Sequence, residues 1–148
     1  MRKLRLGFII CWFAINAVAQ SNFVYTNDSW FPNTVSAFRV NADGSLTLIE
    51  GSPFLTGGNG GGGDVNPGKI TTATVKGKGF LYAANNGSTT IAAFRINADT
   101  GQLVAVPGSP FLAGTPNSNS TLTLAAGPKG HFLFSADEST TSVRVFAI

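Results

Sequence analysis

The side chains suited to chemistry in this sequence are a few carboxylates and amides, each placed at the end of an apolar run. Asp28, Asn85 and Asp137 follow similar short apolar stretches, and Glu138 comes directly after Asp137. Carboxylates from neighbouring segments can bind calcium or share general acid and base roles. Asp and Asn at strand ends also form turns by bonding to their own backbone. These four residues are our candidates for a binding site, and the sequence contains no recognisable catalytic set.

His131 is the only histidine in the chain, and imidazole is the side chain that exchanges protons near neutral pH. The strand expected between His131 and Asp137 has about six residues, which places them roughly 20 Å apart at ~3.3 Å per residue. We therefore expect His131 to be a solvated turn residue. The single cysteine, Cys11, lies in the apolar start of the chain, so the rest has no thiol ligand or nucleophile. The sequence predicts no metal site and no cofactor.

The first nineteen residues have the three parts of a secretory signal peptide. Three basic residues open the chain, an apolar run covers residues 6–17, and Ala17-Val18-Ala19 supplies the small residues of a cleavage site. The run is too short for a comfortable bilayer span, so we expect no stable membrane span. Without this segment seven basic residues balance seven acidic ones, and the high pI gives no indication of nucleic-acid binding. We expect an exported bacterial protein, periplasmic or extracellular, with its mature part at 20–148.

Three short motifs recur in the same order along this mature part. They are Phe-x-Tyr or Phe-x-Phe at 23–25, 80–82 and 132–134, Ala-Phe-Arg at 37–39 and 93–95, and Gly-Ser-Pro-Phe at 51–54 and 108–111. A fixed order and a nearly constant spacing mark an internal repeat of about fifty-five residues. The sequence therefore divides into two and a half copies, at 22–68, 69–119 and 120–148.

The complete middle copy predicts four short strands, at about 69–75, 80–84, 90–96 and 102–106, separated by turn residues. The strands are apolar on both faces, which suits sheets covered on both sides. Repeated four-stranded antiparallel sheets that pack face to face are the blades of a β-propeller. A β-sandwich is the alternative, but it would not explain the repeat. The predicted fold is all-β, a partial β-propeller with one complete blade and two incomplete ones.

The connections between the strands predict where a ligand binds. The crossings between blades and the turns between second and third strands belong to one side of the propeller, which we call the loop face. This face gathers the four candidates Asp28, Asn85, Asp137 and Glu138. Propeller ligands bind in such loops or at the mouth of the central channel, so we expect a small-molecule or glycan ligand there.

Other motifs have structural interpretations. Pro53 and Pro110 offer no N–H and should end the outer strand, while Phe54 and Phe111 should pack between blades. The glycine run at 57–63 approaches the spacing of a phosphate-binding loop. However, Ile70 stands where that loop needs Ser or Thr, so we expect a flexible connection. Ion pairs within a blade, or extension to the surface, are expected for the equivalent residues Arg39 and Arg95.

The middle copy resembles the blades of lactonase-type seven-bladed propellers. The resemblance rests on Phe80-Leu-Tyr-Ala-Ala-Asn85, on the segment 91–103 and on Gly108-Ser-Pro-Phe111, with Gly127-Pro-Lys-Gly130 similar to a turn of that family. That family includes bacterial 6-phosphogluconolactonase, so the resemblance implies lactone hydrolase ancestry. The motifs are scaffold residues and imply the blade more directly than the activity.

Two further functions stay open beside this ancestry: a non-catalytic exported binding or scaffold module, and a fragment without independent function. A seven-bladed ring needs about twenty-eight strands, whereas this sequence predicts about ten. Open ends of such an array expose apolar surface and unpaired strand edges. We therefore expect either a truncated reading frame or self-association of several chains to complete a ring.

Overall fold

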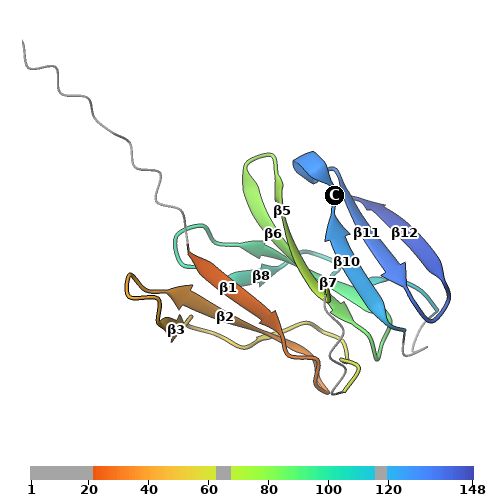
Figure 1. Ribbon diagram of the computed structural model, residues 1–148, viewed down its shortest axis with the longest axis horizontal. Coiled ribbons are helices and arrows are strands. Elements are labelled where there is room, and N and C mark those ends of the chain that lie inside the picture. Colours follow the sequence, from red (N-terminus) through yellow and green to blue (C-terminus); the bar gives the residue numbers. More distant parts are fainter. Residues whose placement is uncertain (1–21, 63–67, 116–119) are drawn as a thin grey trace, which may run out of the picture.

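The computed structural model describes residues 22–62, 68–115 and 120–148, which form three antiparallel β-sheets. The expected signal peptide lies outside the described residues. Figure 1 shows the three sheets following one another in chain order, from orange through green to blue. We call them blades 1, 2 and 3. Within the described ranges, no helix is long and apolar enough to cross a membrane.

The strands reproduce the repeat. Blade 1 contains β1 (Phe23–Asn27), β2 (Thr34–Val40), β3 (Leu46–Leu48) and β4 (Phe54–Leu55). Blade 2 contains β5 (Ile70–Val75), β6 (Lys78–Asn85), β7 (Thr90–Ile96), β8 (Leu103–Ala105) and β9 (Phe111–Leu112). Blade 3 contains β10 (Leu122–Ala126), the 3-10 turn η1 (Pro128–Gly130), β11 (Phe132–Asp137) and β12 (Ser142–Ala147).

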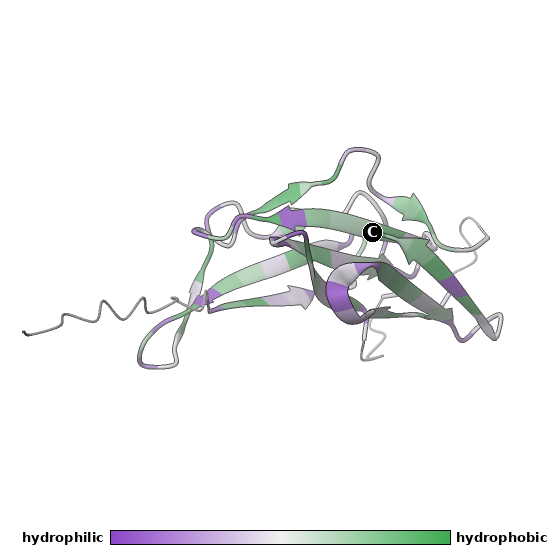
Figure 2. Ribbon diagram, turned by 90° about the horizontal axis from the view of Figure 1, so that it is seen from above, coloured by the Kyte–Doolittle hydropathy of each residue, from purple (hydrophilic) through white to green (hydrophobic). Residues whose placement is uncertain are grey.

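Blade 2 has the strand order β5-β6-β7-β8, while blade 1 begins at the equivalent of β6 and blade 3 stops at the equivalent of β7. The four predicted strands of the middle copy agree with the structure to within two residues. Figure 2 shows apolar residues along the strands of all three blades. The prediction of an all-β partial propeller, with one complete blade and two incomplete ones, is confirmed.

The outer strands of blades 1 and 2 are broken in the middle, which corrects the prediction for the prolines. After β3 the chain turns at Gly51 (φ +85°) and pairing stops, but β4, beyond Pro53, pairs again with the start of β2. The same happens after β8, where β9 pairs with β7 beyond Pro110. Proline removes only its own N–H. The residues after it keep theirs, and the ladder resumes.

A serine hydroxyl bridges each break. Ser52 Oγ accepts the N–H of Ala37 at 2.9 Å, and Ser109 Oγ accepts that of Ala93 at 2.9 Å. Both alanines are buried, so without the serine their N–H groups would be left without a partner in the apolar interior. In the Gly-Ser-Pro-Phe motif, the glycine therefore forms a left-handed turn and the serine hydroxyl replaces a backbone acceptor of the sheet. Pairing between the strands resumes at the phenylalanine.

Two apolar joints hold the blades together. The first joint lies between blades 1 and 2, and its buried members are Val35, Leu81, Ala83, Ala92, Phe94 and Leu103. The second joint lies between blades 2 and 3, and its buried members are Tyr82, Ala84, Ile91, Ala93, Ala113, Leu122, Leu124 and Leu133. Successive side chains of a strand point to opposite faces, so Leu81 packs toward blade 1 and Tyr82 toward blade 3.

The two phenylalanines expected between blades differ in burial. Phe54 is half-buried against the first joint, as predicted. Phe111 is 41% exposed and lines an apolar cleft of about 360 Å³ beside the second joint, so the prediction of burial is wrong for it. The first joint includes Leu103 from β8, and among the described residues blade 3 has no strand in that position. The ring of Phe111 is therefore only partly covered.

The arginines make contacts of a different kind from those expected. Arg39 lies over the ring of Phe23, with its guanidinium carbon 4.9 Å from the ring centroid, and donates to the backbone oxygen of Asp99 at 3.1 Å. This side chain therefore joins blades 1 and 2 through a ring and a carbonyl oxygen. Arg95 is exposed, in agreement with the surface alternative.

Candidate functional site

The ends of β1, β6 and β11 meet at one side of the molecule, together with the crossings between blades. The crossing after blade 1 bonds to the turn of blade 2 through Gly87 N–H and Asn59 O at 3.0 Å. The crossing after blade 2 bonds to the same turn through Ala113 N–H and Thr89 O at 3.0 Å. The loop face thus exists as a continuous surface, and the four candidate residues lie on it.

Asp28 is half-buried and surrounded by hydroxyl donors. Thr34 Oγ1 and Ser36 Oγ donate to its Oδ2 at 2.6 and 2.9 Å, and Thr26 Oγ1 donates to its Oδ1 at 3.0 Å. An ionised carboxylate has about four acceptor positions, and these bonds use three of them. The immediate role of Asp28 is to hold the start of β2 against the end of β1.

Asn85 is fully buried and belongs to a bridge between blades 1 and 2. Asn33 Nδ2 donates to Asn85 Oδ1 at 2.8 Å and to Ala84 O at 3.2 Å. Asn33 Oδ1 accepts the backbone N–H groups of Ser29 and Thr34 at 2.8 and 2.9 Å. Asn85 Nδ2 donates in turn to Thr90 Oγ1 at 3.0 Å. The two amides therefore fix the turn of blade 1 onto blade 2.

Asp137 and Glu138 are adjacent but differ in environment. Asp137 is only 4% exposed, and its Oδ1 accepts the N–H of Ser139 at 3.0 Å in an Asx turn. The crossing after blade 2 passes close to it, since a Cβ added to Gly114 would lie 3.7 Å from Asp137 Oδ2. The Glu138 side chain is exposed. Glu138 is therefore the candidate carboxylate that is accessible to a ligand.

The glycine run is packed against the neighbouring turns, which corrects the expectation of a flexible connection for its described part, 57–62. Gly60 N–H donates to Trp30 O at 2.8 Å, and Gly62 N–H donates to Ser29 O at 3.1 Å. A Cβ added to Gly60 would lie 2.2 Å from the carbonyl carbon of Ser29, and one added to Gly87 would lie 2.3 Å from Gly60 O. Glycine is required because three backbones approach one another closely here. Residues 63–67 lie outside the described part of the chain.

Lys69, the lysine of the apparent phosphate-loop spacing, is buried beneath this packing. It is 6% exposed, and its Nζ donates to Ser29 Oγ at 3.0 Å. A phosphate-binding lysine must reach its ligand from an accessible loop. Lys69 therefore does not occupy the accessible position that the lysine of a phosphate-binding loop needs.

Sequence reasoning missed Asn33 and the exposed aromatic pair next to it. Trp30 and Phe31 are 66% and 61% exposed on the loop face, in the turn that Asn33 anchors. Six residues separate β1 from β2, whereas four separate β6 from β7 and β11 from β12. The two extra residues in this turn, compared with the equivalent turns of the repeat, could have marked it as a candidate binding segment.

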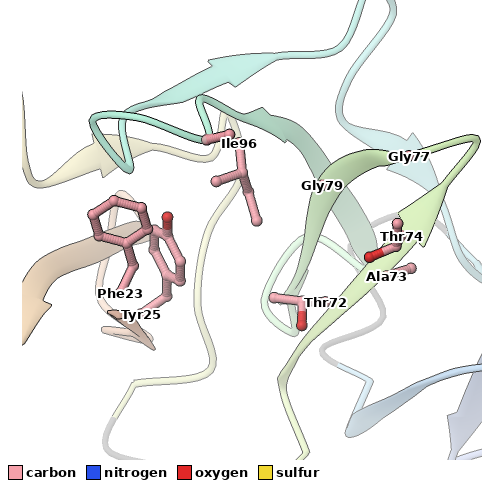
Figure 3. Close-up of a pocket in the computed structure, with 9 residues that line it drawn as sticks. Phe23, Tyr25, Thr72, Ala73, Thr74, Gly77, Gly79 and Ile96 are labelled. Atoms are coloured by element: carbon pink, nitrogen blue, oxygen red, sulfur yellow. The ribbon is translucent and has the colours of Figure 1, made fainter. Parts of the chain in front are cut away.

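Two other features lie away from the loop face. His131 is exposed and precedes β11, whereas Asp137 ends that strand. A cleft of about 400 Å³ lies between β1 and the start of blade 2, lined among others by Phe23, Tyr25 and Thr72 (Figure 3). Burial raises the pKa of Tyr25 to about 12, and its hydroxyl donates to Gly101 O at 2.8 Å. Across the described ranges, no three His, Cys, Asp or Glu residues gather closely enough to hold a metal ion.

Comparison with known proteins identifies the fold family. The family model described as "Lactonase, 7-bladed beta-propeller" matches residues 31–148. The chain is also similar to the crystal structure of a "putative 6-phosphogluconolactonase" from Bacteroides fragilis, at 27% identity and a TM-score of 0.61. That match covers 85% of this chain and 32% of the other, so the chain spans about a third of that protein's length. A search of curated proteins found no match. The chain belongs to the lactonase family of seven-bladed β-propellers.

Proposed function

We propose that this chain is a segment of an exported lactonase-type propeller that binds a sugar-like lactone at its loop face. The observation that carries the proposal is the pair Trp30 and Phe31, 66% and 61% exposed on a turn fixed by buried Asn33. Exposed aromatic rings on a rigid turn suit the apolar face of a sugar ring, while nearby polar groups suit its hydroxyls. The family supports a lactone as the ligand class.

Hydrolysis of the bound lactone is the finer part of this proposal. Opening a cyclic ester requires an activated water and a stabilised oxyanion. Of the four candidates, Glu138 is the one that combines an acidic side chain with an exposed position. It lies on blade 3, whereas the aromatic pair lies on blade 1, so hydrolysis at Glu138 and binding at Trp30 are tested separately.

A non-catalytic binding module is the second candidate, and one specific observation favours it. Asp28, Asn85 and Asp137 are each used in bonds that hold a turn or a joint. Groups with such structural bonds are poorly placed to exchange protons with a substrate. In this case the aromatic pair binds the ligand and no bond is broken.

Glucono-1,5-lactone separates the two. Acid release at constant pH measures hydrolysis above the spontaneous rate. Quenching of Trp30 in a Trp12→Phe background, where Trp30 is the only tryptophan, measures binding. Hydrolysis that falls at least tenfold in Glu138→Ala supports the enzyme. Binding without hydrolysis, abolished by Phe31→Ala, supports the module. If neither signal appears, both functions are wrong for this chain.

A further inference from the structure

Residues equivalent to those that join the blades are exposed on the outer faces of blades 1 and 3. In the first joint Leu81 and Leu103 of blade 2 pack against Val35 of blade 1. In the second joint Leu133 of blade 3 packs against Ile91 of blade 2. Each joint therefore combines the front face of one blade, which carries the leucines, with the back face of the preceding blade. The same pairing rule holds twice in one molecule.

The front face of blade 1 has the apolar residues of a joint, and no other blade among the described residues packs against it. Strand pairing makes Val24 equivalent to Leu81 and Leu133, because each lies opposite the phenylalanine of the next strand. Val24 is 40% exposed, whereas Leu81 and Leu133 are 0% and 3% exposed. Leu46, equivalent to Leu103, is 53% exposed.

The back face of blade 3 is the matching half. Val143 is the second residue of β12, as Val35 is of β2 and Ile91 is of β7. Val143 is 67% exposed, whereas Val35 and Ile91 are 0% and 2% exposed. Val145, two residues further on the same face, is 57% exposed. Such apolar patches on both end blades are typical of surfaces that bind another protein.

We propose that the back face of blade 3 in one copy binds the front face of blade 1 in a second copy, so that chains associate head to tail. This contact pairs the same two kinds of face, one front and one back, as the two joints inside the chain. Each copy carries both kinds of face. This contact is heterologous, so it extends into a ring or a series of oligomers. The proposal does not depend on the proposed function.

The new contact is weaker than the internal joints. In the part of the chain that the structure describes, blade 1 has no counterpart of β5, and blade 3 has no counterpart of β8 or β9. Less apolar area is therefore removed from water than in the internal joints. Association should consequently depend on protein concentration.

Sedimentation velocity of the full chain over a range of concentrations tests the proposal. We expect the average mass to rise with concentration in the unmodified chain. Val24→Glu and Val143→Glu each place a charge in one half of the contact, and each variant should remain monomeric. Val104→Glu is the matched control, because Val104 is a strand valine with 64% exposure outside both faces. It should associate like the unmodified chain.

Mixing the two variants gives the decisive measurement. The Val24→Glu variant keeps an intact back face and the Val143→Glu variant an intact front face, so an equal mixture should form dimers and nothing larger. Leu46→Glu and Val145→Glu provide a second, independent pair, and circular dichroism checks that each variant retains its strands. A monomeric unmodified chain, single variants that associate normally, or a mixture that stays monomeric would each overturn the proposal.

Discussion

Asn33 is the residue on which the loop face depends most directly. It is fully buried, accepts two backbone N–H groups of its own turn and donates to Asn85 of the next blade. Replacement by alanine leaves these buried groups without partners, and we expect Asn33→Ala to lower the free energy of unfolding by about 1–3 kcal/mol. Urea denaturation measures the change.

Asn41 supplies the control for this prediction. It also donates two side-chain bonds, to Ser45 and Thr47, but these are exposed to solvent. Water replaces exposed bonds, so Asn41→Ala should cost less than about 0.5 kcal/mol. Equal effects of the two variants would contradict the role assigned to the bridge.

Because two tyrosine hydroxyls are buried, the free energy of unfolding should depend on pH in the alkaline range. Burial raises the pKa of Tyr25 from 10.0 to about 12 and also raises the pKa of Tyr82. Between pH 10 and about 12 the unfolded chain loses the Tyr25 proton while the folded chain keeps it, so stability should fall across this window. Tyr25→Phe should show a flatter decline in urea midpoint over the same range. A slope unchanged by the substitution would show that Tyr25 does not carry the effect.

At the scale of the element, the broken outer strand depends on a side chain that takes the place of backbone. Ser109→Ala removes the acceptor of the buried Ala93 N–H, and we expect a loss of about 1–3 kcal/mol in unfolding free energy. Ser109→Thr keeps the hydroxyl and should recover most of that loss. Ser45→Ala, in an exposed turn, should change stability by less than about 0.5 kcal/mol. Equal losses in the alanine and threonine variants would show that the hydroxyl is not the cause.

The strands themselves could be predicted from the sequence, because repeated motifs fix the spacing of apolar runs and turn residues. The details at the breaks could not. A proline in the sequence indicates that one backbone N–H is missing from the strand. It does not indicate that the hydroxyls of Ser52 and Ser109 accept the N–H groups of the neighbouring strand at the break, before β4 and β9 resume the pairing. Likewise a glycine run suggests a flexible connection, whereas glycine is required at position 60 because the Ser29 backbone in the turn of blade 1 approaches it closely. Among the candidate residues, Asn85 bonds to Asn33 of blade 1, a contact that the sequence does not reveal. The bonds of Asp28 and Asp137 are to residues within eight positions of them.

At the scale of the whole molecule, blade 2 transmits stability between its neighbours. It contributes to both joints, with Leu81 and Phe94 on one side and Tyr82 and Ile91 on the other. In an array where each repeat contacts only adjacent repeats, the folding of blades 1 and 3 is coupled through the blade between them. A substitution that destabilises the second joint should therefore also destabilise blade 1, although blade 1 contributes no residue to that joint.

Leu133→Ala tests this coupling, because Leu133 is buried in the second joint and Trp30 reports from blade 1. We expect the substitution to lower the unfolding free energy by about 2–5 kcal/mol. In a Trp12→Phe background, the urea midpoint seen by Trp30 fluorescence should fall together with that seen by circular dichroism. Leu48→Ala, at a position 55% exposed, should leave both midpoints nearly unchanged. A Trp30 midpoint that stays constant while the circular dichroism midpoint falls would mean that blade 1 unfolds independently. The head-to-tail contact would then join separate folding units, whereas coincident transitions mean that it extends one cooperative array of blades.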